Sequence, residues 1–170
     1  MGMRLRLAVA SPEDAAELGG NIDEQVDEEF DDDAFDDGFD DGFDAALTLF
    51  DRDGVDVDKN WCALDAILLP DFSGREQFWA GEPCSDDFGY GPAMFTVAAE
   101  VAAISARLSL LTPIQLSERL DSAIATGAIY YPVWEWDSET RRSVVDLAMH
   151  VIAMYSRASA SGLGVISLMV

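Results

Sequence analysis

A dense block of acidic residues at positions 23–58 most restricts how this chain can fold, because unpaired charges are excluded from a protein core. The block contains 17 acidic side chains and a single basic one, Arg52, and so carries −16 of the total net charge of −23. Its centre, residues 35–43, repeats Phe-Asp-Asp-Gly in tandem. Glycine costs about 1 kcal/mol relative to alanine inside a helix, and crowded like charges weaken a helix further. We therefore expect a low-complexity acidic insertion at about residues 23–56, with a short helix near residues 43–50.

The rest of the sequence has the composition of one folded domain. The chain is 170 residues long and 49% hydrophobic, and outside the acidic block its net charge is only −7. Alternation of apolar and polar residues at positions 3–9 predicts a strand. Ser11-Pro12 followed by two acidic residues predicts a helix that begins at Pro12, and Gly19 is expected to end it. A strand followed at once by a helix indicates a single α/β domain that spans residues 1–170.

Further elements are predicted by periodicity and by capping residues. Apolar residues at 97, 101, 104 and 108 predict a helix, which contains many alanines suited to close packing. Thr112-Pro113 opens a helix that ends at Gly127, and a third helix, capped by Ser138, reaches about Ala160. A brief strand is expected at residues 94–97. A continuous apolar run at residues 165–170 predicts a final strand in the centre of the sheet.

The stretch around Trp61 joins the acidic block to the ordinary globular pattern. Trp61, Leu64 and Ile67 recur at helical spacing, which predicts a helix with Trp61 as a core anchor at its start. Asp58 precedes this helix and is expected to cap its first turn.

With these fixed points, the chain resembles the YfbM-like family of small bacterial proteins of uncharacterised function. The resemblance rests on the start Met1-Gly2-Met3, on the motif Asp58-Lys59-x-Trp61-x-x-Leu64, on Gly89-Tyr90-Gly91-Pro92-Ala93, on Tyr131-Pro132, and on the closing helix, glycine and strand. It implies a single α/β domain with helices packed on a mixed sheet that contains the N- and C-terminal strands. Family members commonly carry histidines one and four residues after the tryptophan, where this chain has Cys62 and Asp65. Any chemistry that those histidines perform is therefore not expected here.

One candidate pocket is suggested by polar and aromatic residues near these motifs: Asp58, Lys59, Trp61, Tyr90, Tyr131 and Trp134. The simpler explanation, favoured about three to one on the frequency of caps and buried aromatics, is that these residues are structural.

No complete catalytic set, metal site or cofactor motif is recognisable. The acidic residues do not fit the spacing of a calcium-binding loop, and the single histidine, His150, is expected to pair with Asp146 on a partly exposed helix face. Cys62 and Cys84 have no zinc-type spacing and are expected to be reduced thiols in a cytoplasmic protein. We predict neither a secretory signal nor a membrane helix.

The charge distribution decides between classes of partner. Nucleic-acid backbones and anionic membranes require clustered lysine and arginine, so we expect neither as a partner. The leading hypothesis is a non-enzymatic interaction protein, for example of the immunity type, that offers an acidic surface to a basic protein. The residues expected to form that surface are Asp31, Asp32, Asp33, Asp36, Asp37, Asp40, Asp41 and Asp44. Two alternatives stay open: a small-molecule-binding protein or enzyme that uses the candidate pocket, and a purely solubilising role for the acidic stretch.

Overall fold

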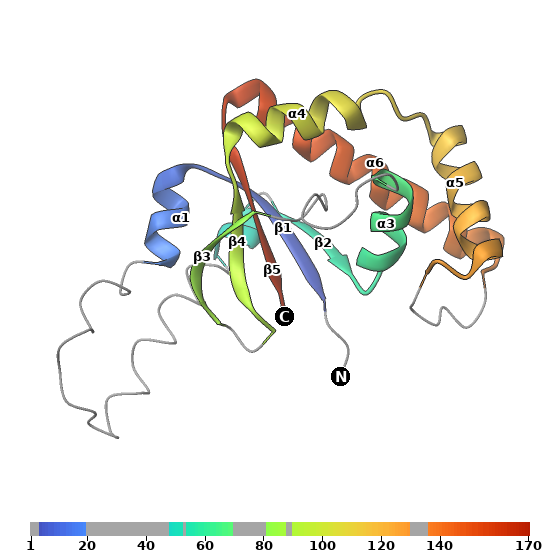
Figure 1. Ribbon diagram of the computed structural model, residues 1–170, viewed down its shortest axis with the longest axis horizontal. Coiled ribbons are helices and arrows are strands. Elements are labelled where there is room, and N and C mark those ends of the chain that lie inside the picture. The colour runs from blue at the N-terminus through green and yellow to red at the C-terminus, as the bar shows by residue number, and fades with distance from the viewer. Residues whose placement is uncertain (1–3, 20–47, 53, 70–80, 88–89, 130–135) are drawn as a thin grey trace, which may run out of the picture.

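The protein is described by a computed structural model that covers residues 4–19, 48–52, 54–69, 81–87, 90–129 and 136–170. The elements are β1 (Leu5–Ala10), α1 (Pro12–Leu18), β2 (Val55–Asp58), α3 (Trp61–Leu68), β3 (Glu82–Asp87), β4 (Pro92–Thr96), α4 (Ala98–Leu108), α5 (Pro113–Thr126), α6 (Ser138–Ser161) and β5 (Gly164–Met169) (Figure 1). Residues 48–52 form one further short helical turn, here called helix 48–52. The α/β class and the single domain predicted from the sequence are confirmed.

The five described strands form one sheet in the order β2-β1-β5-β4-β3. Every pairing among them is antiparallel, so the mixed sheet expected from the resemblance is corrected to an antiparallel one. β5 occupies the centre, as its apolar run predicted, with its residues from Gly164 to Leu168 buried. β1 and β5 pair over their whole lengths, from Leu5 opposite Met169 to Ala10 opposite Gly164.

Alternation along the strands divides the core between the two faces of the sheet. Leu5, Leu7 and Val165 point to one face, where α4 and α6 pack on the sheet and, with α3 and α5 packed on α6, build the larger core. Ala8 and Ile166 point to the other face, where residues of α1 and helix 48–52 build a smaller core. Helix 48–52 is therefore part of the fold.

Capping accounts for most of the helix boundaries. Ser11 caps α1 and Thr112 caps α5, both as predicted, and each forms a reciprocal capping box, Ser11 with Asp14 and Thr112 with Gln115. α5 and α6 each end at a glycine in the left-handed conformation, also as predicted. The start of α6 differs by one residue, because Asp137 rather than Ser138 accepts the hydrogen bond from the backbone N–H of Thr140.

The acidic block proves to have two parts. Its last described residues lie in helix 48–52 and β2, where Leu49, Phe50 and Val57 are buried. This C-terminal part of the acidic block therefore belongs to the folded domain. The Phe-Asp-Asp-Gly repeat, the eight aspartates of the expected acidic surface, and the pocket residues Tyr131 and Trp134 lie outside the described residues.

Candidate functional site

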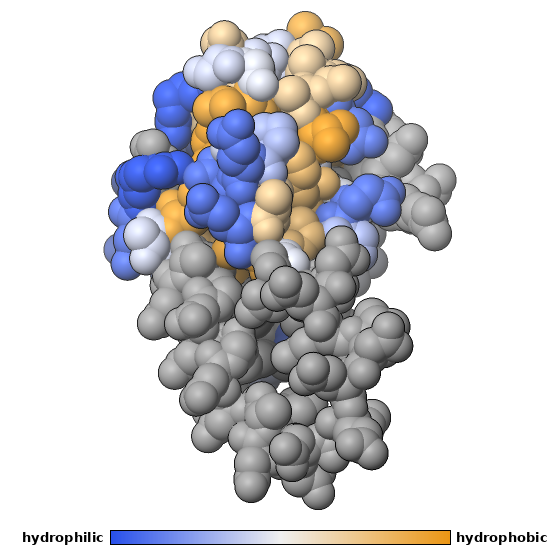
Figure 2. All heavy atoms as spheres, turned by 90° about the vertical axis from the view of Figure 1, so that its left-hand side faces the viewer, coloured by the Kyte–Doolittle hydropathy of each residue, from blue (hydrophilic) through white to orange (hydrophobic). Residues whose placement is uncertain are grey.

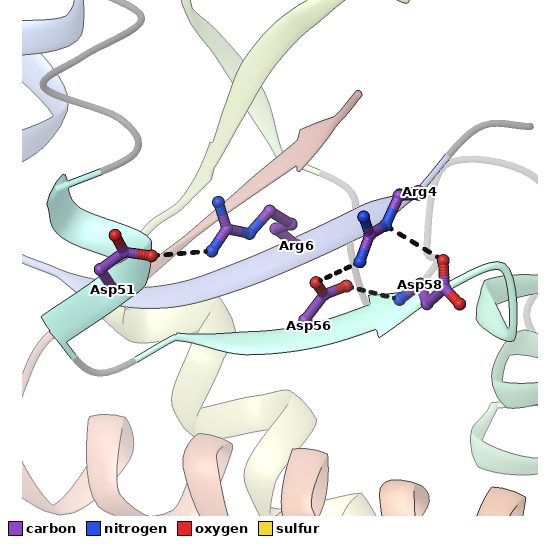
Figure 3. A network of polar contacts seen from close by, with 5 residues as sticks. All are labelled: Arg4, Arg6, Asp51, Asp56 and Asp58. Carbon is purple, nitrogen blue, oxygen red and sulfur yellow. Dashed lines mark hydrogen bonds and ion pairs between the residues drawn. The ribbon is translucent and has the colours of Figure 1, made fainter. Parts of the chain in front are cut away.

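Arg4, the residue just before β1, and Arg6 on β1 hold three aspartates of the acidic block against the sheet (Figure 3). The guanidinium of Arg4 lies 2.8 Å from a carboxylate oxygen of Asp56 and 3.1 Å from one of Asp58, both at the edge strand β2. Arg6, two residues along β1, points to the same side and lies 3.1 Å from Asp51 in helix 48–52. These contacts span 45 and 52 residues of sequence, so they join the far end of the acidic block to the first strand.

Arg6 is the more enclosed of the two arginines. Its side chain is 19% exposed, whereas that of Arg4 is 52% exposed. The guanidinium of Arg6 stacks over the ring of Phe50 at 5.2 Å from the ring centre, a cation–π contact. Its Nε is buried and has no hydrogen-bond acceptor. Because the aspartates are largely exposed, each ion pair contributes at most about 1 kcal/mol. The network therefore sets the position of β2 and helix 48–52 more than it stabilises the domain.

A further ion pair joins α1 to helix 48–52, the described elements that precede and follow the acidic repeat in the chain. Arg52 in helix 48–52 lies 3.8 Å from the carboxylate of Asp14 in α1. Residues 20–47 connect the end of α1 to the start of helix 48–52, so both ends of this connection are anchored at neighbouring places on the domain. Hydrogen bonds from Ser11, the backbone N–H first, lower the pKa of the Asp14 carboxyl, and the charge of Arg52 lowers it further.

The predicted capping role of Asp58 is wrong. Asp58 is the last residue of β2, with a positive φ of 49°, and its carboxylate binds Arg4. Its backbone N–H donates to a carboxylate oxygen of Asp56 at 2.8 Å. The N-cap of α3 is Asn60, whose side chain makes no capping hydrogen bond. The alternation Val55-Asp56-Val57-Asp58, which is typical of an edge strand, was the signal for the true arrangement.

The described members of the candidate pocket do not form one group. Asp58, Lys59 and Trp61 are half-buried neighbours at the junction of β2 and α3, and Trp61 packs against the larger core. Tyr90 is 47% exposed in the connection between β3 and β4. Because β1 and β5 separate β2 from β4, Tyr90 lies about three strand spacings, or about 14 Å, from the β2 position.

A shallow hollow lies beside this junction, where the N-termini of α3 and α6 meet. Its volume is about 330 Å³, and its lining residues are Asn60, Asp137, Glu139, Thr140, Ser143 and Val144. Asn60 stands between the predicted pocket residues Lys59 and Trp61 in the chain. Hydrogen bonds from Thr140, the backbone N–H first, lower the pKa of Asp137, so this carboxylate is charged over a wide pH range. The sequence patterns did not identify this set, because its members come from two distant helix starts.

The histidine, cysteine and acidic side chains in the rest of the described chain do not come together as a catalytic or metal-binding group. Asp146 and His150 are both exposed on α6, and in the described part of the chain no ion pair joins them, so the predicted pair is not formed. Burial raises the pKa of the Cys84 thiol to about 11, which makes it a poor nucleophile.

Within the described ranges, no three histidine, cysteine or acidic side chains gather as metal ligands. No helix in those ranges is both long and apolar enough to cross a membrane.

Asp65 on α3 is the one described carboxylate whose pKa is raised, and burial is the cause. Within the described residues no donor contacts its carboxylate. Ionising this group costs folding free energy, so its contribution to stability falls as pH rises above the unfolded pKa of about 4. Asp65→Asn should therefore gain stability relative to the wild type between pH 3 and pH 7, measured by urea unfolding. Asp146→Asn, which removes the same charge from an exposed position, is the control; an equal gain there would contradict the role of burial.

These features define a class of protein: a single α/β domain in which α4 and α6 pack on one face of a five-stranded antiparallel sheet, and α3 and α5 pack on α6. The model of the family described as a domain of unknown function, DUF1877, matches residues 1–168. The chain belongs to this family, and the resemblance to YfbM-like proteins is confirmed.

A solved structure agrees with this assignment. The crystal structure of a protein of unknown function, YfbM from Escherichia coli, is similar with a TM-score of 0.59 at 18% sequence identity. The similarity covers 98% of this chain and 99% of that chain, and at this identity it supports the fold alone. No curated protein matches the chain.

Proposed function

We propose that this protein is a non-enzymatic binding protein whose acidic segment, residues 23–44, engages a basic protein surface. An immunity-type protein that neutralises a basic toxin is one concrete form. One observation carries the proposal. The acidic residues that border the segment, Asp14, Asp51, Asp56 and Asp58, face arginines of the domain itself. Residues 23–44, by contrast, contain 13 acidic residues and no basic one.

The anchored ends support this proposal on physical grounds. A segment fixed at both ends loses less conformational entropy on binding than a free tail does. Clustered negative charge also accelerates encounters with a positively charged partner. The Arg52–Asp14 pair joins helix 48–52 to α1, and the Arg6–Asp51 pair joins it to β1, so the described elements on both sides of the segment have fixed places.

The first experiment compares two variants that lose the same charge. In one, Asp36, Asp37, Asp40 and Asp41 of the tandem repeat become asparagine. In the control, four exposed acidic residues of the domain, Glu17, Glu82, Glu118 and Asp146, become their amides. Proteins captured from native lysate at about 50 mM and about 300 mM salt are identified, and the salt-sensitive candidate is purified for a binding titration. The repeat variant should bind at least about 10-fold more weakly than the control variant.

Two results would contradict the proposal. One is the absence of any partner whose capture weakens with salt. The other is equal binding by the wild type and a variant in which a neutral linker replaces residues 31–44.

The hollow beside Asn60 favours a second candidate function, a small-molecule-binding protein. Its volume of about 330 Å³ is at the lower limit of common ligand sites, about 300–1,000 Å³. The test is a screen of small metabolites by NMR on the wild type and on Ser143→Trp, which fills the hollow. Shifts confined to Asn60 and Thr140 that disappear in the variant would support this function. Shifts that persist in the variant would exclude the hollow as their source.

A further inference from the structure

Helix 48–52 is attached to the domain through three consecutive residues, which together with their two partners are here called the latch. The latch consists of Phe50, Asp51 and Arg52 on the helix, Arg6 on β1 and Asp14 in α1. The ring of Phe50 lies against the guanidinium of Arg6, and the carboxylate of Asp51 pairs with the same guanidinium (Figure 3). Arg52 lies 3.8 Å from Asp14. Charged groups therefore take part in every contact of the latch.

The two charged residues at the centre of the latch differ in their access to solvent. The side chain of Arg6 is 19% exposed, whereas that of Asp51 is 76% exposed. One hydrogen bond of 3.1 Å joins them, from Nη2 of Arg6 to Oδ1 of Asp51. The Nε of Arg6 is buried and has no acceptor. The closed latch therefore holds a largely buried guanidinium against a carboxylate that solutes can reach from outside.

This asymmetry makes the latch sensitive to external cations. A cation that binds the exposed carboxylate of Asp51 takes it away from Arg6. A buried charge that loses its partner strongly disfavours the arrangement that buries it, and an unsatisfied buried donor adds to that cost. When helix 48–52 lifts off the sheet, water reaches the guanidinium and both costs disappear. Such a cation therefore binds the open form more tightly than the closed form, which is the condition for a ligand to shift a conformational equilibrium.

The apolar contacts that oppose opening are few. Leu49 and Phe50 are the buried hydrophobic residues of helix 48–52. The smaller core that they join is bordered by partly buried residues, Cys84, Phe95 and Val170. On the side of α1 and β3, hydrophobic surface lies beside hydrophilic side chains (Figure 2). Opening is therefore a local event that leaves the larger core on the other face of the sheet intact.

We propose that helix 48–52 is a charge-operated latch, which opens when a basic ligand engages Asp51 and separates it from Arg6. The acidic segment ends at residue 44, seven residues before Asp51, so a basic protein surface bound to the segment is close to the latch along the chain. Opening frees Leu49 and Phe50 for apolar contacts with the same partner. The inference rests on the function proposed above for its natural trigger, but the latch itself can be tested without that partner.

Hydrogen exchange followed by NMR on the full chain tests the latch, with deca-arginine as the probe. The reporter is the N–H of Gly54, which donates to the carbonyl of Phe50 at 2.9 Å. A helix as short as residues 48–52 is not stable alone, so this bond is lost when the helix lifts. The N–H of Leu64, which donates to the carbonyl of Asn60 at 2.9 Å, is the internal control. Deca-arginine should accelerate exchange at Gly54 at least about 10-fold and change it less than about 2-fold at Leu64.

Variants separate a latch from a simple attachment. Asp51→Asn removes the exposed carboxylate and should accelerate exchange at Gly54 at least about 5-fold without any peptide. Asp146→Asn, which removes the same charge from an exposed position of α6, is the matched control and should exchange as the wild type does. Arg6→Met replaces the buried guanidinium with an apolar side chain of similar length. It should exchange no faster than the wild type and respond less than about 2-fold to deca-arginine, because no buried charge is left without a partner.

Two results would overturn the latch: wild-type exchange at Gly54 that deca-arginine leaves unchanged, and an Arg6→Met variant that opens as readily as Asp51→Asn. The outcome for the proposed function is separate. A natural basic partner that binds without faster exchange at Gly54 contradicts the latch alone. Opening by deca-arginine in the absence of any natural partner supports the latch and contradicts the function.

Discussion

Phe50→Ala is expected to lower the free energy of unfolding by about 3–5 kcal/mol, the usual cost of removing a buried aromatic ring. Phe50 is 3% exposed and belongs to the smaller core, between the sheet and helix 48–52. The substitution also removes the cation–π contact with Arg6, which contributes about 1 kcal/mol. Urea unfolding followed by circular dichroism measures the change.

The loss should be partly local, because Phe50 anchors helix 48–52, the first described element after the acidic segment. The backbone around it is closely packed: the N–H of Gly54 donates to the carbonyl of Phe50 at 2.9 Å. We therefore expect faster proteolysis after helix 48–52 in Phe50→Ala under conditions where most molecules are folded. Phe50→Leu keeps much of the apolar volume and should cost about half as much. Equal costs for the two substitutions, or a loss below about 1 kcal/mol for alanine, would show that the ring does not anchor this helix.

Local sequence signals predicted the helices well, because a cap acts within one turn. The pair Ser11 and Asp14 and the pair Thr112 and Gln115 each lie within four residues, and both capping boxes are formed. Asp58 failed as a predicted cap because its environment is decided by Arg4, more than fifty residues away in the chain. The antiparallel sheet likewise depends on pairings between distant strands, such as β1 with β5, which no local pattern contains.

The candidate site could be predicted only in part, because its contacts join residues that are distant in the chain. Composition identified the acidic block, but only the register between β1 and β2 shows that Asp56 and Asp58 face Arg4. The hollow was missed for a related reason, because Asn60 and Asp137 meet only through tertiary packing.

Gly164→Ala is expected to destabilise the domain by about 3 kcal/mol, at the upper end of the usual cost of overpacking. Gly164 opens the central strand β5 and lies opposite Ala10 of β1. A Cβ atom at this position would lie 2.3 Å from the ring of Phe95 and 2.7 Å from the backbone oxygen of Thr96. The ring can turn aside, but the Thr96 carbonyl belongs to the neighbouring strand β4 and cannot move without disturbing the sheet.

A double-mutant cycle with Phe95→Leu separates these two obstacles in urea unfolding experiments. Leucine lacks the ring atoms that approach Gly164, so the cost of Gly164→Ala should fall by about 1 kcal/mol in the Phe95→Leu background but not vanish, since the Thr96 oxygen remains. Gly162→Ala is the comparison: there a Cβ meets no atom within 4 Å, and only the left-handed φ of 66° opposes alanine, at a cost of about 1 kcal/mol. If Gly164→Ala costs no more than Gly162→Ala, or if Phe95→Leu leaves its cost unchanged, β4 and β5 do not pack as closely as this contact requires.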